Sequence, residues 1–564
     1  MAYLSGGWDK NAVPRRDYPT KKLEALWNKM AFIQFHDCVT GTHCDASYAE
    51  LERTVREVRR GGEQIYHDAA LELLRGRGVA VPEGWRAAVY WNPTPYTVRY
   101  PRLLLRGPVC LKQERGERSA ECGDLPRGQV DTKTVKVFTA EGQPLTAFDT
   151  EVTDGMADAF VRVTVRADVP PFGCRVFLWQ PGKEERRAEC GERKSEGSLW
   201  QPESGEETTA PLRETVIENE YYRVTAANGR VSEIYDKAAG RPLVTDGGLT
   251  LTVDNGSPWG RDCPEGESTL LYADATAAEQ DDGFARLTLS GRFSDAEREI
   301  DSLDWRVTVT LYGGEKLVRF STVLDWQGER TRVYASFTPA FAHDGQIRCE
   351  VPFGQMTRGS AEDVNCLGWC DDWPSLGFAG VTGEGMNLAL LKGGFPGTGV
   401  KDDALRLALL RAVQDKNALF HNSYQGANVR GRHEAAFALA SGEGEFAACD
   451  FSGQAALFNT QGHTECVTAR EGASLPEGSL LPWLSALPEG LRLSAVKRAE
   501  DGEGIVIRLW ESAGKPANLS VPATAALLRC DALERPLTEE AVTAYAFRPF
   551  EIATFRVRGG GRSF

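Results

Sequence analysis

Two histidines and two aspartates stand within ten residues of one another near the start of the sequence, in the segment QFHDCVTGTHCD. They are His36, Asp37, His43 and Asp45, and the whole chain has only 7 histidines. Imidazole nitrogens and carboxylate oxygens are donors that zinc prefers in proteins. The segment therefore predicts a zinc-type site. The structural alternative is a histidine whose cation favours a helix C-terminus, beside aspartates that cap helices.

The second of these pairs has a competing role. His43 and Asp45 are two residues apart, a spacing that suits two ligands of one metal ion. Asp45 also stands just before a run of helical periodicity that begins at Tyr48, where an aspartate is a favourable N-cap. We therefore assign the capping role to Asp45 and keep His36 and Asp37 as the candidate functional pair.

Other sequence patterns offer little chemistry. The sequence has no phosphate-binding loop, no nucleophile elbow and no dinucleotide-binding glycine pattern. Cys366 and Cys370 form a single pair without the second pair of a zinc motif, and we interpret them as structural or incidental. The remaining well-separated histidines are interpreted as structural or surface residues: His67, His343, His421, His433 and His463.

Composition excludes several classes of protein. The 564 residues carry 65 Lys and Arg against 80 Asp and Glu, a net charge of −15, which disfavours nucleic acid as a partner. The sequence has no uninterrupted run of about 18 apolar residues, so it predicts no membrane-spanning helix. The 13 cysteines are odd in number and scattered, which does not suit a disulfide framework. The first residues lack the basic and apolar regions of a secretory signal. We therefore expect reduced thiols and a cytoplasmic protein.

The elements that must position His36 are helices. Apolar residues recur at helical spacing from Leu23 to Ala31. A second run starts at Tyr48 and continues through Leu51, Val55 and Val58 in steps of three and four. Such a seam is typical of a helix that packs against another helix. The motif with His36 and Asp37 lies between the two predicted helices.

The hydrophobic period changes from 3.6 to 2 after residue 82. Segments such as 161–166, 305–311 and 505–510 alternate apolar and polar residues, with turn residues between them. This pattern predicts a mainly β protein: an N-terminal helical-bundle segment, a large antiparallel β-sandwich and a small terminal β domain. The domains we predict are a helical segment 1–80, a first β domain 85–212, a large sandwich 213–460 and a terminal domain 461–564.

The motif QFHDCVTGT resembles the signature of the family 38 glycoside hydrolases, the retaining α-mannosidases, most closely those of the bacterial type. Later segments follow the family in order: VYWNP from residue 89, ENEYY from residue 218, GRHE from residue 431 and SAVKR from residue 494. The resemblance thus covers nearly the whole chain. It implies a helical bundle followed by a mutarotase-like supersandwich and a terminal β domain.

The resemblance also implies roles for two residues. In the family a zinc ion lies at the floor of the mannose pocket, and the histidine of this motif is one of its ligands. His36 is therefore expected to bind zinc, and Asp37 to contact the sugar. The substrate implied is a mannose-containing oligosaccharide or glycoside. The reaction needs two carboxylates, a nucleophile that forms a glycosyl-enzyme and an acid that protonates the leaving oxygen.

The family places these carboxylates and the other zinc ligands before the motif, on an α/β barrel. Here 35 residues precede His36, and their only aspartates, Asp9 and Asp17, match no family motif. We therefore expect the carboxyl-terminal portion of such an enzyme, with an incomplete zinc site and little activity alone, since a zinc site wants three or four protein ligands. A separate polypeptide with the barrel would complete it.

Two other functions stay open. The first is a non-catalytic carbohydrate-binding or interaction protein, in which Trp259, Trp369 or Trp373 stack on sugar faces. The second is a hydrolase that works from a sandwich face through convergent carboxylates. The two helices would normally lie against the barrel; in the lone chain their apolar side chains would face water, which predicts self-association, such as a homo-oligomer.

Overall fold

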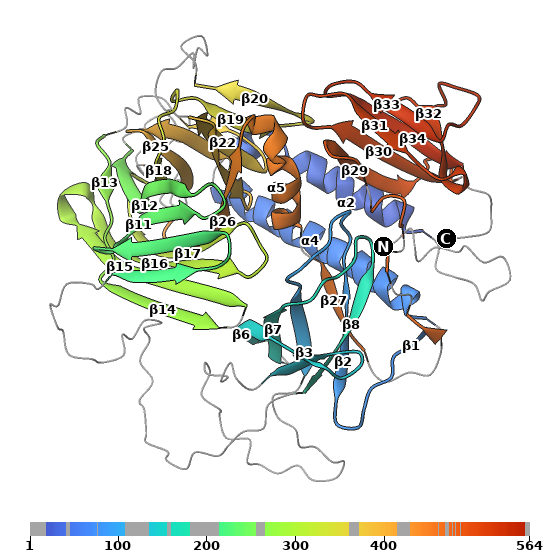
Figure 1. Cartoon of the computed structure of the whole chain (residues 1–564), viewed down its shortest axis with the longest axis horizontal. Helices are drawn as coiled ribbons and strands as arrows, with labels where there is room; N and C mark the ends of the chain where they lie inside the picture. The colour runs from blue at the N-terminus through green and yellow to red at the C-terminus, as the bar shows by residue number, and fades with distance from the viewer. Residues whose placement is uncertain are drawn as a thin grey trace.

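The structure of the protein is a computed structural model. It describes residues 18–40, 45–75, 77–107, 135–154, 159–180, 214–254, 266–281, 283–359, 372–413, 429–460, 462–467, 473–475, 478–479, 481–485, 487–502 and 504–558. The fold class predicted from the sequence is confirmed: helices at the start are followed by antiparallel sheets (Figure 1).

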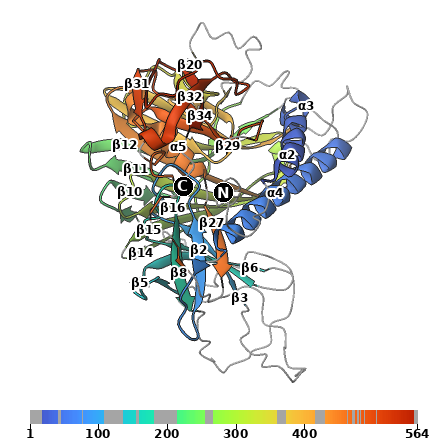
Figure 2. The ribbon, with the colours of Figure 1, turned by 90° about the vertical axis from the view of Figure 1, so that its right-hand side faces the viewer.

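Helices α2 (Thr20–Ile33), α3 (His36–Thr40) and α4 (Asp45–Leu73) form the helical segment. The predicted seam of α4 is covered at one end only, since its buried residues are Ile65, Ala69 and Ala70. Helix α2 has no buried residue. Figure 2 shows the two long helices projecting from one side of the molecule, with the C-terminal end of α4 beside the sheets. We call α2, α3 and α4 the hairpin.

Two nine-stranded antiparallel sheets build the large sandwich. The first sheet contains β9 (Thr215–Glu218), β10 (Tyr222–Ala227), β11 (Arg230–Asp236), β12 (Arg241–Val253), β13 (Thr269–Leu270), β18 (Thr331–Pro339), β21 (Trp373–Pro374), β24 (Gly397–Lys401) and β25 (Ala404–Ala412). The second contains β14 (Ala275–Asp281), β15 (Phe284–Asp295), β16 (Ile300–Tyr312), β17 (Val318–Gly328), β19 (Ile347–Val351), β20 (Gly354–Arg358), β22 (Phe378–Gly383), β23 (Met386–Lys392) and β26 (Gly431–Glu443).

Alternation along the strands places one face of each sheet in the common core. Strand β17 shows it most clearly, with every second side chain buried. Phe320 of β17 stacks on Phe437 of β26 with 5.0 Å between ring centroids, and Phe337 of β18 meets Phe320 edge-on. These rings join the two sheets. The short helix α5 (Phe451–Asn459) follows β26, with the Asp450 carboxylate accepting from the Gly453 amide at its start.

A small β domain lies at the base of the hairpin (Figure 1). It contains β2 (Arg86–Trp91), β3 (Arg102–Gly107), β4 (Lys136–Thr139), β5 (Pro144–Leu145), β6 (Ala147–Asp154), β7 (Ala159–Val165), β8 (Cys174–Gln180) and β27 (His463–Val467). The late strand β27 pairs antiparallel with β2 and so returns to the start of the chain. A short parallel pair, β1 (Arg77–Gly78) with β28 (Ala473–Ser474), does the same.

The terminal β domain packs its own apolar core. Its strands are β29 (Leu491–Arg498), β30 (Ile505–Glu511), β31 (Ala517–Ser520), β32 (Ala526–Cys530), β33 (Ala544–Phe547) and β34 (Ile552–Arg558). Short 3-10 turns occur at Ala296–Arg298, Phe446–Cys449 and Ala523–Ala525. In the part of the chain that the structure describes, no helix has both the length and the apolar character to cross a membrane.

Candidate functional site

His36 and Asp37 lie at the outer end of the hairpin, where they begin α3 directly after α2. The Nε2 atom of His36 is 3.7 Å from Oδ2 of Asp37, and the two side chains are 75% and 36% exposed. The ring of Phe35 packs beside the imidazole with 4.2 Å between centroids. The two predicted residues are therefore adjacent and accessible from solvent.

Of the second predicted pair, His43 and Asp45, the structure describes only Asp45. Asp45 is the first residue of α4. A negatively charged side chain in the first turn stabilises a helix by its interaction with the helix dipole. His43 lies outside the described residues, as do Trp259 and Trp369. Trp373 packs against the core of the large sandwich, and the Arg358 guanidinium lies 5.4 Å from its ring centroid.

The residues around His36 do not fit a zinc ion by themselves. A zinc site takes three or four protein ligands. Among the described histidines, cysteines and carboxylates, only one group brings three donor atoms within reach of one ion, and His36 does not belong to it. The zinc-binding role of His36 therefore stays a prediction.

Large apolar side chains are exposed on the same hairpin. Trp27 is 69% exposed and Phe32 is 73% exposed, values that are unusual for residues of this size. The exposed large apolar residues of the hairpin, with the turn between α2 and α3, are Trp27, Phe32, Phe35, Val39, Tyr48, Val55 and Leu71. Exposed apolar surface, where it is contiguous, is typical of interaction sites. The predicted site residues thus lie among side chains suited to contact another protein surface.

A cavity of about 1850 Å³ runs from the end of the hairpin to the outer face of the second sheet of the large sandwich. Gln34 and Val39, which flank His36 and Asp37, line it at the hairpin. On the sheet it is lined by Arg306 and Thr308 of β16, and by Tyr312, whose ring stacks on Tyr100 at 4.6 Å. Guanidinium, hydroxyl and aromatic groups together suit a hydroxyl-rich ligand such as a sugar.

Sequence reasoning missed one group of side chains. His67 and His463 were interpreted as isolated, but the structure brings both against Glu465. Their separation of 396 positions leaves no local signal in the sequence. The long-range pairing of β27 with β2 creates the group.

Comparison with known families gives three collinear matches. Residues 7–73 match the alpha mannosidase middle domain, and residues 217–418 match the C-terminal domain of family 38 glycosyl hydrolases. Residues 490–555 match the C-terminal beta sandwich domain of the same family. The three matches together span more than half of the chain. This chain belongs to the family 38 glycoside hydrolases.

The family 38 matches map onto the structure in a simple way. The middle-domain match contains the hairpin with His36 and Asp37, and the C-terminal match covers most of the large sandwich. The last match coincides with the terminal β domain. None of the three matches is to a catalytic barrel domain.

Two solved structures share the fold of this family 38 chain. An α-mannosidase from Enterococcus faecalis V583 has a TM-score of 0.72 at 17% identity, covering 96% of this chain and 64% of its own. A family 38 glycosyl hydrolase from Enterococcus faecalis has a TM-score of 0.69 at 18% identity, covering 99% of this chain and 67% of its own. This chain therefore spans about two thirds of their length. A search among curated proteins gave no match.

Proposed function

We propose that this chain forms the middle and carboxyl-terminal part of a zinc-dependent, retaining α-mannosidase that hydrolyses terminal α-mannosides of oligosaccharides or glycosides. The proposal is supported by the family and by the fold shared with the Enterococcus faecalis α-mannosidase. In this proposal a catalytic barrel outside the sequence, such as one on a separate polypeptide, contributes the nucleophile, the acid and the remaining zinc ligands.

The observation that carries the proposal is the position of His36. Its imidazole is three-quarters exposed at the outer end of the hairpin, beside Asp37 and next to the rim of the cavity. One exposed histidine cannot hold zinc tightly, but it can complete a site whose other ligands come from a docked domain. The exposed apolar residues around it suit such docking.

A reducing compartment is part of the proposal. No disulfide joins any of the described cysteines, and Cys174, Cys349 and Cys530 are buried. Structural disulfides are typical of oxidising compartments. We therefore place the protein in the cytoplasm, where free thiols persist.

The test is hydrolysis of an aryl α-mannoside by the purified chain, with added zinc and with a chelator. We expect no turnover above the buffer blank in either condition, because neither catalytic carboxylate is assigned to this chain. Zinc-dependent turnover at an ordinary enzymatic rate, on the order of 1–1000 per second, would refute the proposal. His36→Ala would then show whether that turnover depends on the motif.

The cavity favours a second candidate function, carbohydrate binding without catalysis. Its sheet wall carries Arg306 and Thr308 and needs no zinc. In a mannan-affinity experiment, this function predicts retention that survives both chelation and His36→Ala but is weakened by Arg306→Ala. Arg432→Ala, on an exposed arginine paired with Glu434, is the matched control. Absence of retention would exclude this candidate.

A further inference from the structure

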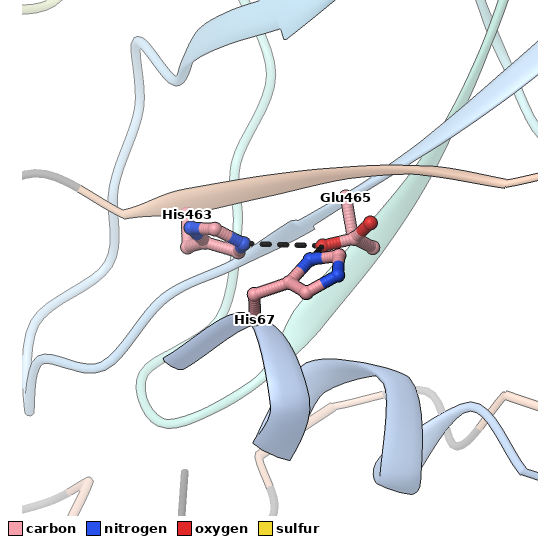
Figure 3. A group of neighbouring side chains, drawn as sticks. All are labelled: His67, His463 and Glu465. Atoms are coloured by element: carbon pink, nitrogen blue, oxygen red, sulfur yellow. Dashed lines mark hydrogen bonds and ion pairs between the residues drawn. The ribbon is translucent and has the colours of Figure 1, made fainter. Parts of the chain in front are cut away.

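Three potential metal ligands meet where the hairpin joins the small β domain. His67 projects from α4, and His463 and Glu465 project from β27 (Figure 3). The Nδ1 atom of His67 is 2.7 Å from Oε2 of Glu465, and Nε2 of His463 is 3.3 Å from the same oxygen. The three donor atoms all lie within 4.8 Å of one another.

The backbone holds the three residues in place. His463 and Glu465 are two positions apart on one strand, so their side chains leave the same face. Strand β27 is fixed by its pairing with β2. The last turns of α4 pack on this sheet, since Ala70 and Leu74 share an apolar cluster with Trp91 of β2. The cluster is therefore positioned by regular elements rather than by loops.

We propose that His67, His463 and Glu465 bind a divalent cation of the zinc type. Two imidazoles and one carboxylate are a common zinc donor set, with the fourth position left to water. Donor atoms of a tetrahedral zinc site are about 3.4 Å apart. The His463–Glu465 distance already has this value, while His67 has to move outward by about 0.7 Å, a small change for a side chain that is 41% exposed.

The charge of the cluster also favours a cation. The Glu465 side chain is only 11% exposed, and its salt-bridge partners in the described structure are the two histidines. A histidine is positively charged only when protonated, so the buried carboxylate has no permanent counter-ion there. A divalent cation would supply this charge and release both imidazoles to serve as neutral ligands.

The neighbouring Tyr66 is an independent sign that polar groups gather here. Its ring lies against that of His463 with 4.6 Å between centroids. Its hydroxyl is buried without a hydrogen-bond partner in the described structure. Buried polar atoms are seldom left unpaired, and those that are often mark a missing ion or water.

The proposed site is separate from the residues of the family motif. His67 is 22 residues beyond the start of α4, which is about 33 Å along a helix. A cation bound there would join α4 to β27 and fix the base of the hairpin that carries His36 at its other end. The inference rests on the three side chains and does not depend on the proposed activity.

The probe is zinc alone, added to the full chain after its metal has been removed by chelation and dialysis. We expect one equivalent to bind, measured by competition with a chromogenic chelator, and the melting temperature to rise. His67→Ala and His463→Ala should each weaken binding by about 100-fold or more, because two protein ligands hold zinc poorly. His343→Ala and His433→Ala are the controls and should bind as the parent does.

Two results would overturn the proposal. One is the absence of a saturable zinc site in the parent chain. The other is binding that His67→Ala and His463→Ala leave unchanged, in which case the three residues form only a hydrogen-bonded cluster. His67→Ala decides the matter if the strand variant does not fold, since alanine at a part-exposed helical position favours the helix. The melting temperature without metal checks that each variant is folded.

Discussion

Asp254, which directly follows β12, is a buried carboxylate held by two arginines. It is 1% exposed, and its Oδ2 atom accepts from Nε of Arg332 and from Nε of Arg411, both at 2.6 Å. Burial disfavours the ionised form, but the hydrogen bonds and charges of the two arginines outweigh it and lower the pKa of Asp254 to about 2. The carboxylate therefore stabilises the folded protein as an anion.

Asp254→Asn is predicted to lower the free energy of unfolding at pH 7 by about 3 kcal/mol, because two arginines lose their buried counter-charge. A lowered folded-state pKa gives stability that is present above the unfolded value of about 3.9 and is lost as pH falls toward 2. Urea unfolding of parent and variant between pH 7 and pH 2.5 should therefore converge at the acid end. The control is Asp325→Asn, at an exposed position of β17. A constant difference across this range would contradict the assignment.

Lys392, at the end of β23, is a buried cation of a different kind. It is 1% exposed, and its ammonium donates to the carbonyl oxygens of Ser375 at 2.9 Å and Pro396 at 3.3 Å. Burial lowers the pKa of Lys392 to about 7, with a smaller opposing influence from Cys349 and Glu350. The folded protein therefore releases this proton more readily than the unfolded chain does.

Lys392→Met removes the titrating ammonium group. The variant is therefore the reference when the free energy of unfolding is measured as a function of pH. Between pH 7 and 10.5 the unfolded parent binds more protons at Lys392 than the folded parent, so the parent gains stability as pH rises. Relative to the variant, we expect the free energy of unfolding of the parent to increase by about 2 kcal/mol between pH 7 and 9. Denaturant unfolding across that range measures it. Parallel profiles of parent and variant would show that Lys392 is not shifted.

At the scale of the elements, two adjacent glycines of α4 differ in their distance from α2. A Cβ atom on Gly61 would lie 2.7 Å from Cδ2 of Leu26 in α2, whereas one on Gly62 would meet nothing within 4 Å. The approach of α2 to α4 thus depends on Gly61 and not on its neighbour.

Gly62→Ala is predicted to stabilise the hairpin by about 0.5–1 kcal/mol, the usual gain of alanine over glycine inside a helix. Gly61→Leu should instead push Leu26 away and speed hydrogen exchange of the α2 amides, while Gly62→Leu should not. Hydrogen exchange followed by mass spectrometry of α2 peptides reports this directly. Equal exchange in the two leucine variants would mean that the helices do not touch at Gly61.

At the scale of the whole molecule, the exposed hairpin residues and the net charge of −15 oppose each other. Apolar surface drives copies of the chain together, and like charge keeps them apart. Added salt screens the repulsion without weakening the apolar contact. The balance between these two forces decides whether the isolated chain associates with itself.

Self-association is predicted to strengthen when NaCl is raised from about 20 to 500 mM, where the screening length shrinks severalfold. Trp27→Glu and Phe32→Glu should reduce it at least severalfold, since each introduces charge on the hairpin. Leu537→Glu, at a residue that is 60% exposed in the terminal domain, should not. Sedimentation velocity measures all four proteins. A monomer at both salt concentrations, or an equal effect of the Leu537 variant, would contradict this prediction.

Local patterns predicted much of the fold. The alternation at 305–311 lies within β16, and the helical steps from Tyr48 lie within α4, because each element presents one apolar face with its own period. Helix α5 was not predicted, because nine residues are too few to show a clear helical period. It also lies within the range 213–460, for which only sandwich strands were predicted. The division of the chain into domains stays a prediction. Even so, β27 belongs to the same sheet as β2, far from it in sequence.

By itself the sequence determined the mainly β fold class and, through the motif with His36 and Asp37, the glycoside hydrolase family. Both follow from neighbouring residues, whose types and spacing are local information. Only the tertiary structure decided that His36 stands exposed on the hairpin and that His67 meets His463 and Glu465. These outcomes depend on which distant segments pack together, and that is set by burial of apolar faces across the whole chain rather than by any local period.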